Sequence, residues 1–110
     1  MHLPNAERAV VEIEKLRDYC LSMSHPRGRH KARVFESTLG IKASDAEELR
    51  QALLSAARAF DAMVTEQDEY GQRYVLDFPF ERPGRRAIIR SSWIIRTGDD
   101  YPRLISCYVL

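Results

Sequence analysis

The feature that most constrains the fold is a change in the spacing of apolar residues near residue 62. Before this point apolar residues recur every three or four positions, which predicts amphipathic helices. After it they alternate with other residues, which predicts half-buried strands. Helices followed by strands with short turns indicate an α+β fold. We therefore expect N-terminal helices packed on one face of a three- to four-stranded antiparallel sheet.

Three helices are expected, over residues 12–23, over residues 28–39 and from residue 44 onward. Pro26 separates the first two, since the residue before a proline resists the α conformation. Gly40 is suited to ending the second helix. Ser44 to Glu47 form a capping box that predicts the start of the third. The apolar face expected for the third helix is Leu49, Leu53, Ala56 and Phe60.

The strands are predicted over residues 74–80, 86–96 and 104–110, with a short extended piece at 9–11. Polar turns over 66–72, 82–84 and 98–100 separate them. In the strand over 86–96, Trp93 lies on the uncharged face, which we assign to the core. The opposite face carries Arg86, Ile88, Arg90, Ser92, Ile94 and Arg96.

Length and charge limit the broad class of protein. The chain has 110 residues, so we expect a single domain over 1–110. Its net charge of +1 argues against an indiscriminate nucleic-acid coat, although residues 45–70 are acidic and residues 27–33 and 82–96 are basic. Cys20 and Cys107 are expected to be reduced and buried. No apolar run approaches the length of a membrane span, so we expect a cytoplasmic protein that contacts no membrane.

The basic cluster over residues 27–33 is placed where the second helix should begin. A helix N-terminus carries a partial positive charge, so cations there are disfavoured unless an anion binds. His30 could act as a general acid or base, with Lys31 and Arg33 holding a phosphate. The alternative is a solvated basic helix end whose histidine packs on a neighbouring strand.

The second basic group is the outer face of the strand over 86–96. Cations on one sheet face repel one another unless an anion lies across them. The alternative is an ordinary solvent-facing strand whose arginine stems cover Ile88 and Ile94. If the second helix packs near this strand, the two basic groups form one site. Histidine, lysine, arginine and tyrosine together suit RNA cleavage without a metal, and tyrosines could stack a base.

The candidate residues follow from these two groups. No metal or cofactor is expected, because the three histidines lack zinc-ligand spacing and the chain has no glycine-rich phosphate loop. The catalytic candidates are His30, Lys31, Arg33, Arg90 and Ser92. The candidates for binding phosphate or RNA are Arg27, Arg29, Arg86, Arg96 and Tyr108.

Several stretches of the sequence resemble a bacterial family, domain of unknown function 6883. The stretches are Leu3-Pro4-Asn5-Ala6, Lys15-Leu16-Arg17-Asp18-Tyr19, Gly28-Arg29-His30-Lys31-Ala32-Arg33, Tyr70-Gly71-Gln72 and Pro102-Arg103-Leu104. The resemblance covers nearly the whole chain and implies a small toxin-type module. By the order of its elements the chain also resembles, more distantly, the ribonuclease superfamily of barnase, EndoU, colicin and RelE.

These observations support one main hypothesis and two alternatives. The main hypothesis is a metal-independent endoribonuclease toxin of a toxin–antitoxin system, which binds RNA and is neutralised by a cognate protein. The first alternative is a non-catalytic module that binds an anion or an acidic protein through the same surface. The second is the antidote subunit of such a pair, which would use the acidic region over 45–69 as its contact surface.

Overall fold

The computed structural model describes residues 1–110 and contains helical segments followed by a four-stranded antiparallel sheet, as the sequence predicts. The helical elements are η1 (Ala6–Arg8), α1 (Ile13–Lys15), η2 (Leu16–Cys20), α2 (Arg29–Val34), η3 (Phe35–Leu39), η4 (Ala43–Asp45) and α3 (Ala46–Ala59). The strands are β1 (Met63–Asp68), β2 (Gly71–Arg82), β3 (Arg85–Arg96) and β4 (Arg103–Val109).

The first two predicted helices each consist of an α-helical turn that continues as a π-helix. The first is shorter than predicted, since η2 ends at Cys20 rather than at residue 23. The second covers 29–39, close to the predicted range, and Gly40 follows it with a φ of 69°. Only glycine adopts this left-handed conformation without steric cost, which confirms Gly40 as the stop signal.

The start of α3 differs from the predicted capping box. The Asp45 carboxylate accepts a bond of 2.9 Å from the Lys42 backbone N–H, whereas the Ser44 hydroxyl caps nothing. Leu49, Leu53 and Ala56 are buried as predicted. Phe60 was wrongly placed with them, because it lies beyond the end of the helix in an extended conformation and is 39% exposed.

The strand order is β1-β2-β3-β4, so β1 and β4 form the two edges of the sheet. β1 begins close to the predicted position but continues into the predicted turn, which shortens that turn to two residues. The predicted extended piece near Val10 is confirmed as a parallel bridge to Arg103 at the outer edge of β4. The chain therefore covers the β4 edge with its own N-terminal segment.

The β2–β3 hairpin has a regular register across the Pro83–Gly84 turn, from Arg82 opposite Arg85 to Gly71 opposite Arg96. Trp93 is fully buried, which confirms the core face assigned to β3. Ser91 is the one buried polar side chain on this face. Its hydroxyl donates to the Leu76 carbonyl oxygen (2.7 Å) and accepts from Trp93 Nε1 (2.9 Å), so its polar atom is satisfied.

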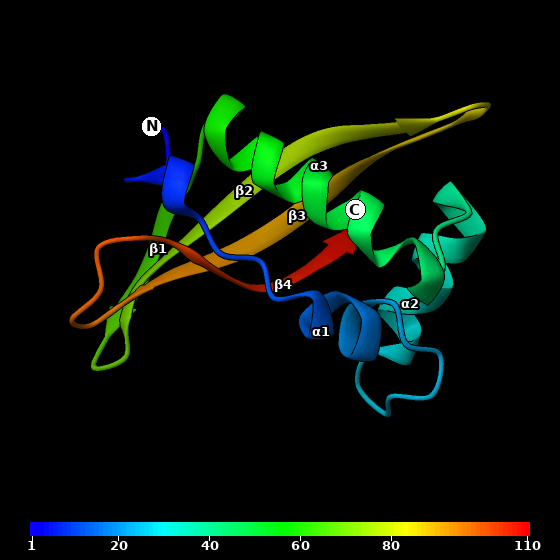
Figure 1. Ribbon diagram of the computed structural model, residues 1–110, viewed down its shortest axis with the longest axis horizontal. Coiled ribbons are helices and arrows are strands. Elements are labelled where there is room, and N and C mark those ends of the chain that lie inside the picture. The colour runs from blue at the N-terminus through cyan, green and yellow to red at the C-terminus, as the bar shows by residue number, and fades with distance from the viewer.

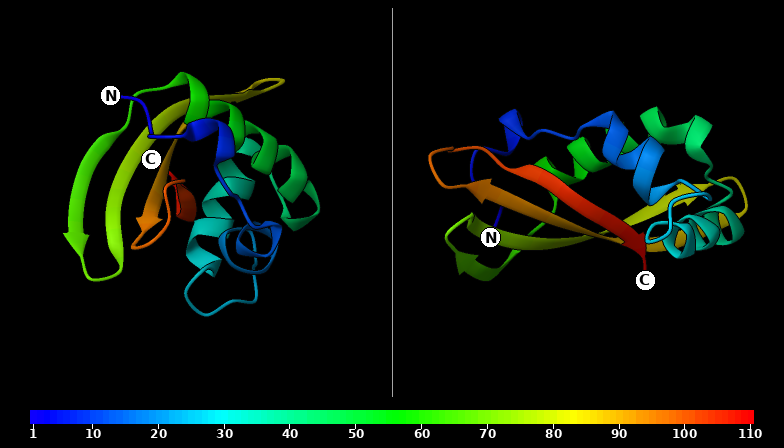
Figure 2. Two further views of the ribbon diagram at one scale, coloured as in Figure 1. Left: turned by 60° about the vertical axis from the view of Figure 1, so that its left-hand side comes forward. Right: turned by 90° about the horizontal axis from the view of Figure 1, so that it is seen from below.

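The helices lie on one face of the sheet, with α3 crossing β2 and β3 (Figure 1). The segments α1, η2 and α2 lie beside β4, whereas β1 forms the edge farthest from them (Figure 2). No helix has the length and apolar character needed to span a membrane. The fold thus brings the first two helical segments against one edge of the sheet.

Candidate functional site

The loop that leads into α2 is held by a histidine. The Nδ1 atom of His25 accepts hydrogen bonds from the backbone N–H groups of Arg27 (3.0 Å) and Gly28 (3.1 Å). The backbone N–H of Arg29 donates to the His25 carbonyl oxygen. The backbone N–H groups of Arg27, Gly28 and Arg29 therefore already have partners, whereas those of His30 and Lys31, in the first turn of α2, form no backbone hydrogen bond.

The same contacts define the state of the His25 ring. An Nδ1 atom that accepts two N–H bonds carries no proton, so the neutral ring holds its proton on Nε2. The ring packs edge-on against Tyr19, with 4.7 Å between ring centroids. His25 therefore offers a fixed Nε2–H donor beside Tyr19.

Lys31 is the member of the basic cluster that turns inward. It is half-buried, and its ammonium group donates to the Tyr19 hydroxyl oxygen (3.1 Å) and to the Ser106 hydroxyl oxygen (3.0 Å). It also lies 4.9 Å from the centroid of the Tyr19 ring and 5.9 Å from that of Tyr108. No carboxylate forms an ion pair with it. Its neighbours are two hydroxyls, two aromatic rings and the Cys20 thiol, whose pKa its charge helps to lower.

Lys31 also connects α2 to the predicted residues on the sheet. In the β3–β4 ladder Ser106 lies opposite Ser92, and Tyr108 lies opposite Arg90. Directly opposed residues place their side chains on the same face of a sheet. The structure thus brings Lys31, Arg90, Ser92 and Tyr108 to one region, with Ser106 as the link between helix and sheet.

An open pocket of about 570 Å³ lies between the first helical segment and β4. Tyr19, His25 and Ser106 line it. Lys31 is not part of the lining, but it donates hydrogen bonds to the hydroxyls of Tyr19 and Ser106. The Tyr19 hydroxyl accepts from Lys31 and keeps its own proton free to donate into the pocket, whereas the Ser106 hydroxyl also contacts the Cys20 sulfur, at 3.8 Å. The remaining lining residues are Glu12, Glu14, Lys15 and Ile105.

The two acidic residues of this pocket differ in their surroundings. Glu12 accepts a bond of 3.0 Å from Arg103, whose other Nη atom donates to the Tyr101 hydroxyl. Glu14 is exposed and has no cation partner. The pocket therefore holds one neutralised carboxylate and one free carboxylate, which is able to accept a proton.

The outer face of β3 is less basic than the sequence suggested. Arg90 donates two bonds, of 2.9 and 2.8 Å, to the carboxylate of Asp77, its direct neighbour on β2. These bonds lower the pKa of Asp77 and raise that of Arg90, to which Tyr108 also contributes. Arg86 pairs in the same way with the opposing Glu81, at 3.3 Å.

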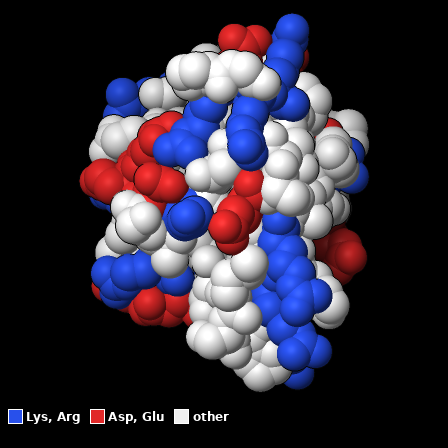
Figure 3. Space-filling model, turned by 90° about the vertical axis from the view of Figure 1, so that its right-hand side faces the viewer, with Lys and Arg blue, Asp and Glu red and all other residues white.

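The remaining predicted residues lie outside this region. Arg86 and Arg96 are at opposite ends of β3, and ten residues at about 3.3 Å each put them roughly 30 Å apart, too far for one phosphate. His30, Arg27, Arg29 and Arg33 are exposed and have no side-chain partner. One side of the molecule carries an elongated strip of Lys and Arg atoms (Figure 3).

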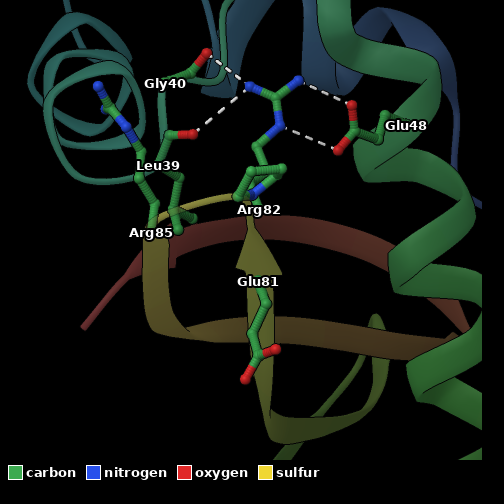
Figure 4. A pocket seen from close by; sticks show the side chains of 7 residues that line it. Leu39, Gly40, Glu48, Glu81, Arg82 and Arg85 are labelled. Atoms are coloured by element: carbon green, nitrogen blue, oxygen red, sulfur yellow. Dashed lines mark hydrogen bonds and ion pairs between the residues drawn. The ribbon is translucent and has the colours of Figure 1, made fainter.

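A second hollow, of about 560 Å³, lies at the tip of the β2–β3 hairpin. The guanidinium group of Arg82, which lines this hollow, donates two hydrogen bonds of 3.0 and 2.8 Å to the Glu48 carboxylate (Figure 4). It also donates to the Leu39 and Gly40 carbonyl oxygens, and Arg85 donates to two carbonyls of η3. These arginines cap the C-terminus of η3 and hold it to the hairpin, which is a structural role.

Both cysteines are reduced and buried, as predicted. The Cys20 sulfur lies 3.8 Å from the Ser106 hydroxyl. Contact with Cys107 lowers the pKa of Cys20 to about 6, helped by Ser106 and Lys31. The same contact and complete burial raise the pKa of Cys107. Nowhere in the chain do three His, Cys, Asp or Glu side chains gather closely enough to hold a metal ion.

Sequence reasoning missed Tyr19, His25, Ser106 and Asp77. Asp77 was recoverable, because a two-residue turn at Pro83–Gly84 pairs residues whose numbers add to 167, and this sets Asp77 opposite Arg90. For His25 the sequence carries no recognised capping signal, since it is three residues before the N-cap Gly28. For Ser106 the sequence carries no local signal, since its partner is on a distant helix.

Comparisons with known proteins agree with this architecture. The family described as Domain of unknown function (DUF6883) matches residues 2–110. A solved structure described as a contact-dependent growth inhibition toxin–immunity protein complex from Klebsiella pneumoniae 342 contains a similar chain. The match has a TM-score of 0.69 at 17% identity and covers 92% of this chain and 99% of that one, so the two share a fold. No curated protein has a matching sequence.

Proposed function

The chain belongs to the DUF6883 family, and on that premise we propose that it is a toxin-type endoribonuclease that works without a metal. The proposed active site is the pocket between η2 and β4. The observation that carries the proposal is Lys31, a half-buried cation without an acidic partner, held by two hydroxyls that line this pocket. The fold shared with a chain of a toxin–immunity complex supports the same class of protein.

The chemistry of the pocket suits a phosphodiester. Tyr19 and the Nε2–H of His25 offer two donors, and Ser106 adds a hydroxyl that it shares with the Cys20 sulfur. The positive charge of Lys31 lies directly behind the two hydroxyls. Such an array stabilises the extra negative charge that phosphorus carries when a nucleophile attacks it. Arg90 and Tyr108, on the adjoining strands, extend the same face and would bind the neighbouring nucleotide.

The reaction is an internal transesterification of RNA. Glu14, the free carboxylate of the pocket, takes the proton of the ribose 2′-OH, and the 2′-oxygen attacks the adjacent phosphorus. The bond from phosphorus to the 5′-oxygen breaks, and the Tyr19 hydroxyl gives its proton to that oxygen. The products are a 2′,3′-cyclic phosphate and a free 5′-OH. Ser106 and His25 hold the phosphate, and Lys31 acts through the two hydroxyls.

A cognate neutralising protein is part of this proposal, because an unrestrained ribonuclease would damage the cell that makes it. In the solved complex the name of the assembly pairs a toxin with an immunity protein. The exposed cations Arg27, Arg29 and Arg33 would receive either RNA phosphates or an acidic partner surface. One region would then serve both substrate binding and neutralisation.

The test combines purified protein with a set of end-labelled RNAs in the presence of a metal chelator. We expect fragments that end in 2′,3′-cyclic phosphate, and no cleavage of RNA whose 2′-OH groups are replaced by hydrogen. Lys31→Met should lower the rate about 100-fold or more. The matched control is Lys42→Met, which changes an exposed lysine about 3.9 Å from Glu36 and away from the pocket.

Cell growth gives the second readout. Expression of the wild-type chain without a neutralising protein should stop growth, with broken RNA in the cell extract. Harmless expression with intact RNA would overturn the proposal. Salt-dependent RNA binding without cleavage would instead identify a binding module, and protection of cells from a toxin encoded beside it would identify an antidote subunit.

A further inference from the structure

The two edges of the sheet are treated differently by this chain. At the β4 edge the Val10 N–H donates to the Pro102 carbonyl oxygen, and the Leu104 N–H donates to the Val10 carbonyl oxygen, both at 2.9 Å. At the β1 edge the N-terminal segment reaches only as far as Ala62, the residue directly before the strand, and the Ala62 N–H donates to the Met1 carbonyl oxygen. All six residues of β1 are exposed, and β1 lies at the margin of the sheet farthest from α1 and α2 (Figure 2). Its outer N–H and C=O groups are therefore open to another strand.

β1 begins with two exposed apolar side chains and continues with four polar ones. Met63 is 66% exposed, Val64 is 53% exposed, and Tyr70, in the following turn, is 65% exposed. A single exposed apolar residue needs no explanation, but a bare strand with several of them is a template for strand addition. β1 contains neither a lysine nor a proline, and its register against β2 is regular except for a shift between Val64 and Gln67.

The charge of the segment narrows the choice of partner. Residues 59–72 contain no lysine, arginine or histidine, and they contain four acidic residues. Asp68 pairs with Arg73, and Asp61 lies 3.7 Å from the N-terminal ammonium group, whereas Glu66 and Glu69 have no cation partner. Two copies of this edge would repel each other, and so would RNA. A strand that carries lysine or arginine complements it.

We propose that β1 is the docking site for a basic β-strand of a partner protein. The added strand would extend the four-stranded sheet by one, with main-chain bonds supplying affinity and Glu66 and Glu69 selecting a basic sequence. Because β2 and β3 separate β1 from β4, the bound partner leaves the pocket beside β4 open. This docking site does not depend on the proposed ribonuclease activity.

The experiment adds three synthetic nine-residue peptides, one at a time, to the full chain. NMR and amide hydrogen exchange measure whether and where each peptide binds. The first peptide alternates valine with lysine, the second replaces lysine with glutamate, and the third is the lysine peptide with prolines at two central positions. At a lysine-peptide concentration about ten times its Kd, exchange of the outward amides of β1 should slow about tenfold. The glutamate and proline peptides should give no protection, and added salt should weaken the binding.

A charge reversal gives the matched control. The double variant Glu66→Lys and Glu69→Lys should prefer the glutamate peptide, whereas Glu7→Lys, on the exposed η1 segment, should behave as the wild type. Three results would overturn the proposal. They are equal binding of the acidic peptide by the wild type, protection at β4 instead of β1, and concentration-dependent dimerisation through β1 without peptide, which would make a second copy the occupant.

Discussion

The ammonium group of Lys31 lies 3.0 Å from the hydroxyl oxygen of Ser106, although 75 residues separate them in the sequence. This bond joins α2 to β4, and a second bond from the same group joins α2 to Tyr19 in η2. Three elements that meet only in the folded chain thus hold one cation beside a pocket. The proposed catalytic chemistry depends on this arrangement.

The two hydroxyls that accept from Lys31 should differ in their contribution to activity. Tyr19→Phe removes the proposed proton donor, so we expect the rate of RNA cleavage to fall about 100-fold or more. Ser106→Ala removes one hydrogen bond to the phosphate, and a loss of about tenfold is expected. Single-turnover cleavage of one RNA oligonucleotide measures both.

The controls for these variants are Tyr70→Phe and Ser55→Ala, two exposed residues away from the pocket. Both should cleave RNA at the wild-type rate. The pH–rate profile separates chemistry from structure, because loss of the Tyr19 proton should remove the alkaline limb of the profile, whereas a general loss of folding would lower the rate at every pH. Wild-type cleavage by Tyr19→Phe would exclude Tyr19 as the donor.

The bond between Asp77 and Arg90 should make stability depend on pH on the acid side. Arg90 holds the pKa of Asp77 below its ordinary value, so the ionised pair stabilises the fold above about pH 4, the pKa of an unfolded aspartate. This contribution is lost as the pH falls through the lowered native pKa. The free energy of unfolding of Asp77→Asn should therefore be lower than that of the wild type at pH 7, and the difference should shrink as the pH falls below about 4.

Urea unfolding at pH 7, 5 and 3 measures this difference, and Asp99→Asn is the control because Asp99 has no cation partner. The pair is about one-third exposed, so raising the salt concentration should reduce the effect at pH 7. A difference that stays constant from pH 7 to pH 3 would show that the aspartate charge contributes nothing.

The parts of the fold that the sequence predicted are those governed by local spacing. The alternation from Tyr74 to Phe80, the glycine stop at Gly40 and the burial of Trp93 each follow from neighbours in the chain, and all three are present. Even the pairing of Asp77 with Arg90 follows from the position of the Pro83–Gly84 turn, although it was not anticipated.

The candidate site was predicted less completely because it is made by packing. A helix period shows that Lys31 lies on some face of α2, but it does not show which distant strand that face meets. The inward turn of Lys31, the outward turn of His30 and the use of His25 as a cap all depend on how α2 docks against η2 and β4. The charges of His25, His30 and Lys31 do not show which of the three side chains points inward.

Arg82 should contribute more to stability than any arginine on the open face of the sheet. Its guanidinium binds the Gly40 carbonyl oxygen at 2.7 Å and grips Glu48, which ties the end of η3 and α3 to the hairpin (Figure 4). We expect Arg82→Ala to lower the free energy of unfolding by about 2 kcal/mol. Arg82→Lys should recover only part, because an ammonium group cannot make the same fork of bonds.

The control is Arg86→Ala, since the Arg86 side chain is 73% exposed and makes one surface ion pair with Glu81. Its effect should stay within about 0.5 kcal/mol. Urea denaturation of the three variants at neutral pH gives the comparison. Equal effects of Arg82→Ala and Arg86→Ala would mean that the hairpin arginine does not anchor η3.

Adding a single methyl group at Gly28, as in Gly28→Ala, should lower the stability of the fold and also disturb the pocket between η2 and β4. Its φ is −84°, which any residue adopts, so the reason for glycine is contact and not conformation. A Cβ atom here would overlap the backbone carbonyl group of Tyr19. Gly28→Ala must therefore push α2 away from η2, at a cost of about 2 kcal/mol, and it should separate Lys31 from the Tyr19 hydroxyl.

Gly84→Ala is the matched control, because its φ of 73° brings strain of about 1 kcal/mol in open space far from the pocket. Thermal unfolding should show both variants destabilised, but only Gly28→Ala should lose RNA cleavage at a temperature where both remain folded. Full activity and wild-type stability in Gly28→Ala would show that α2 and η2 are not in close contact.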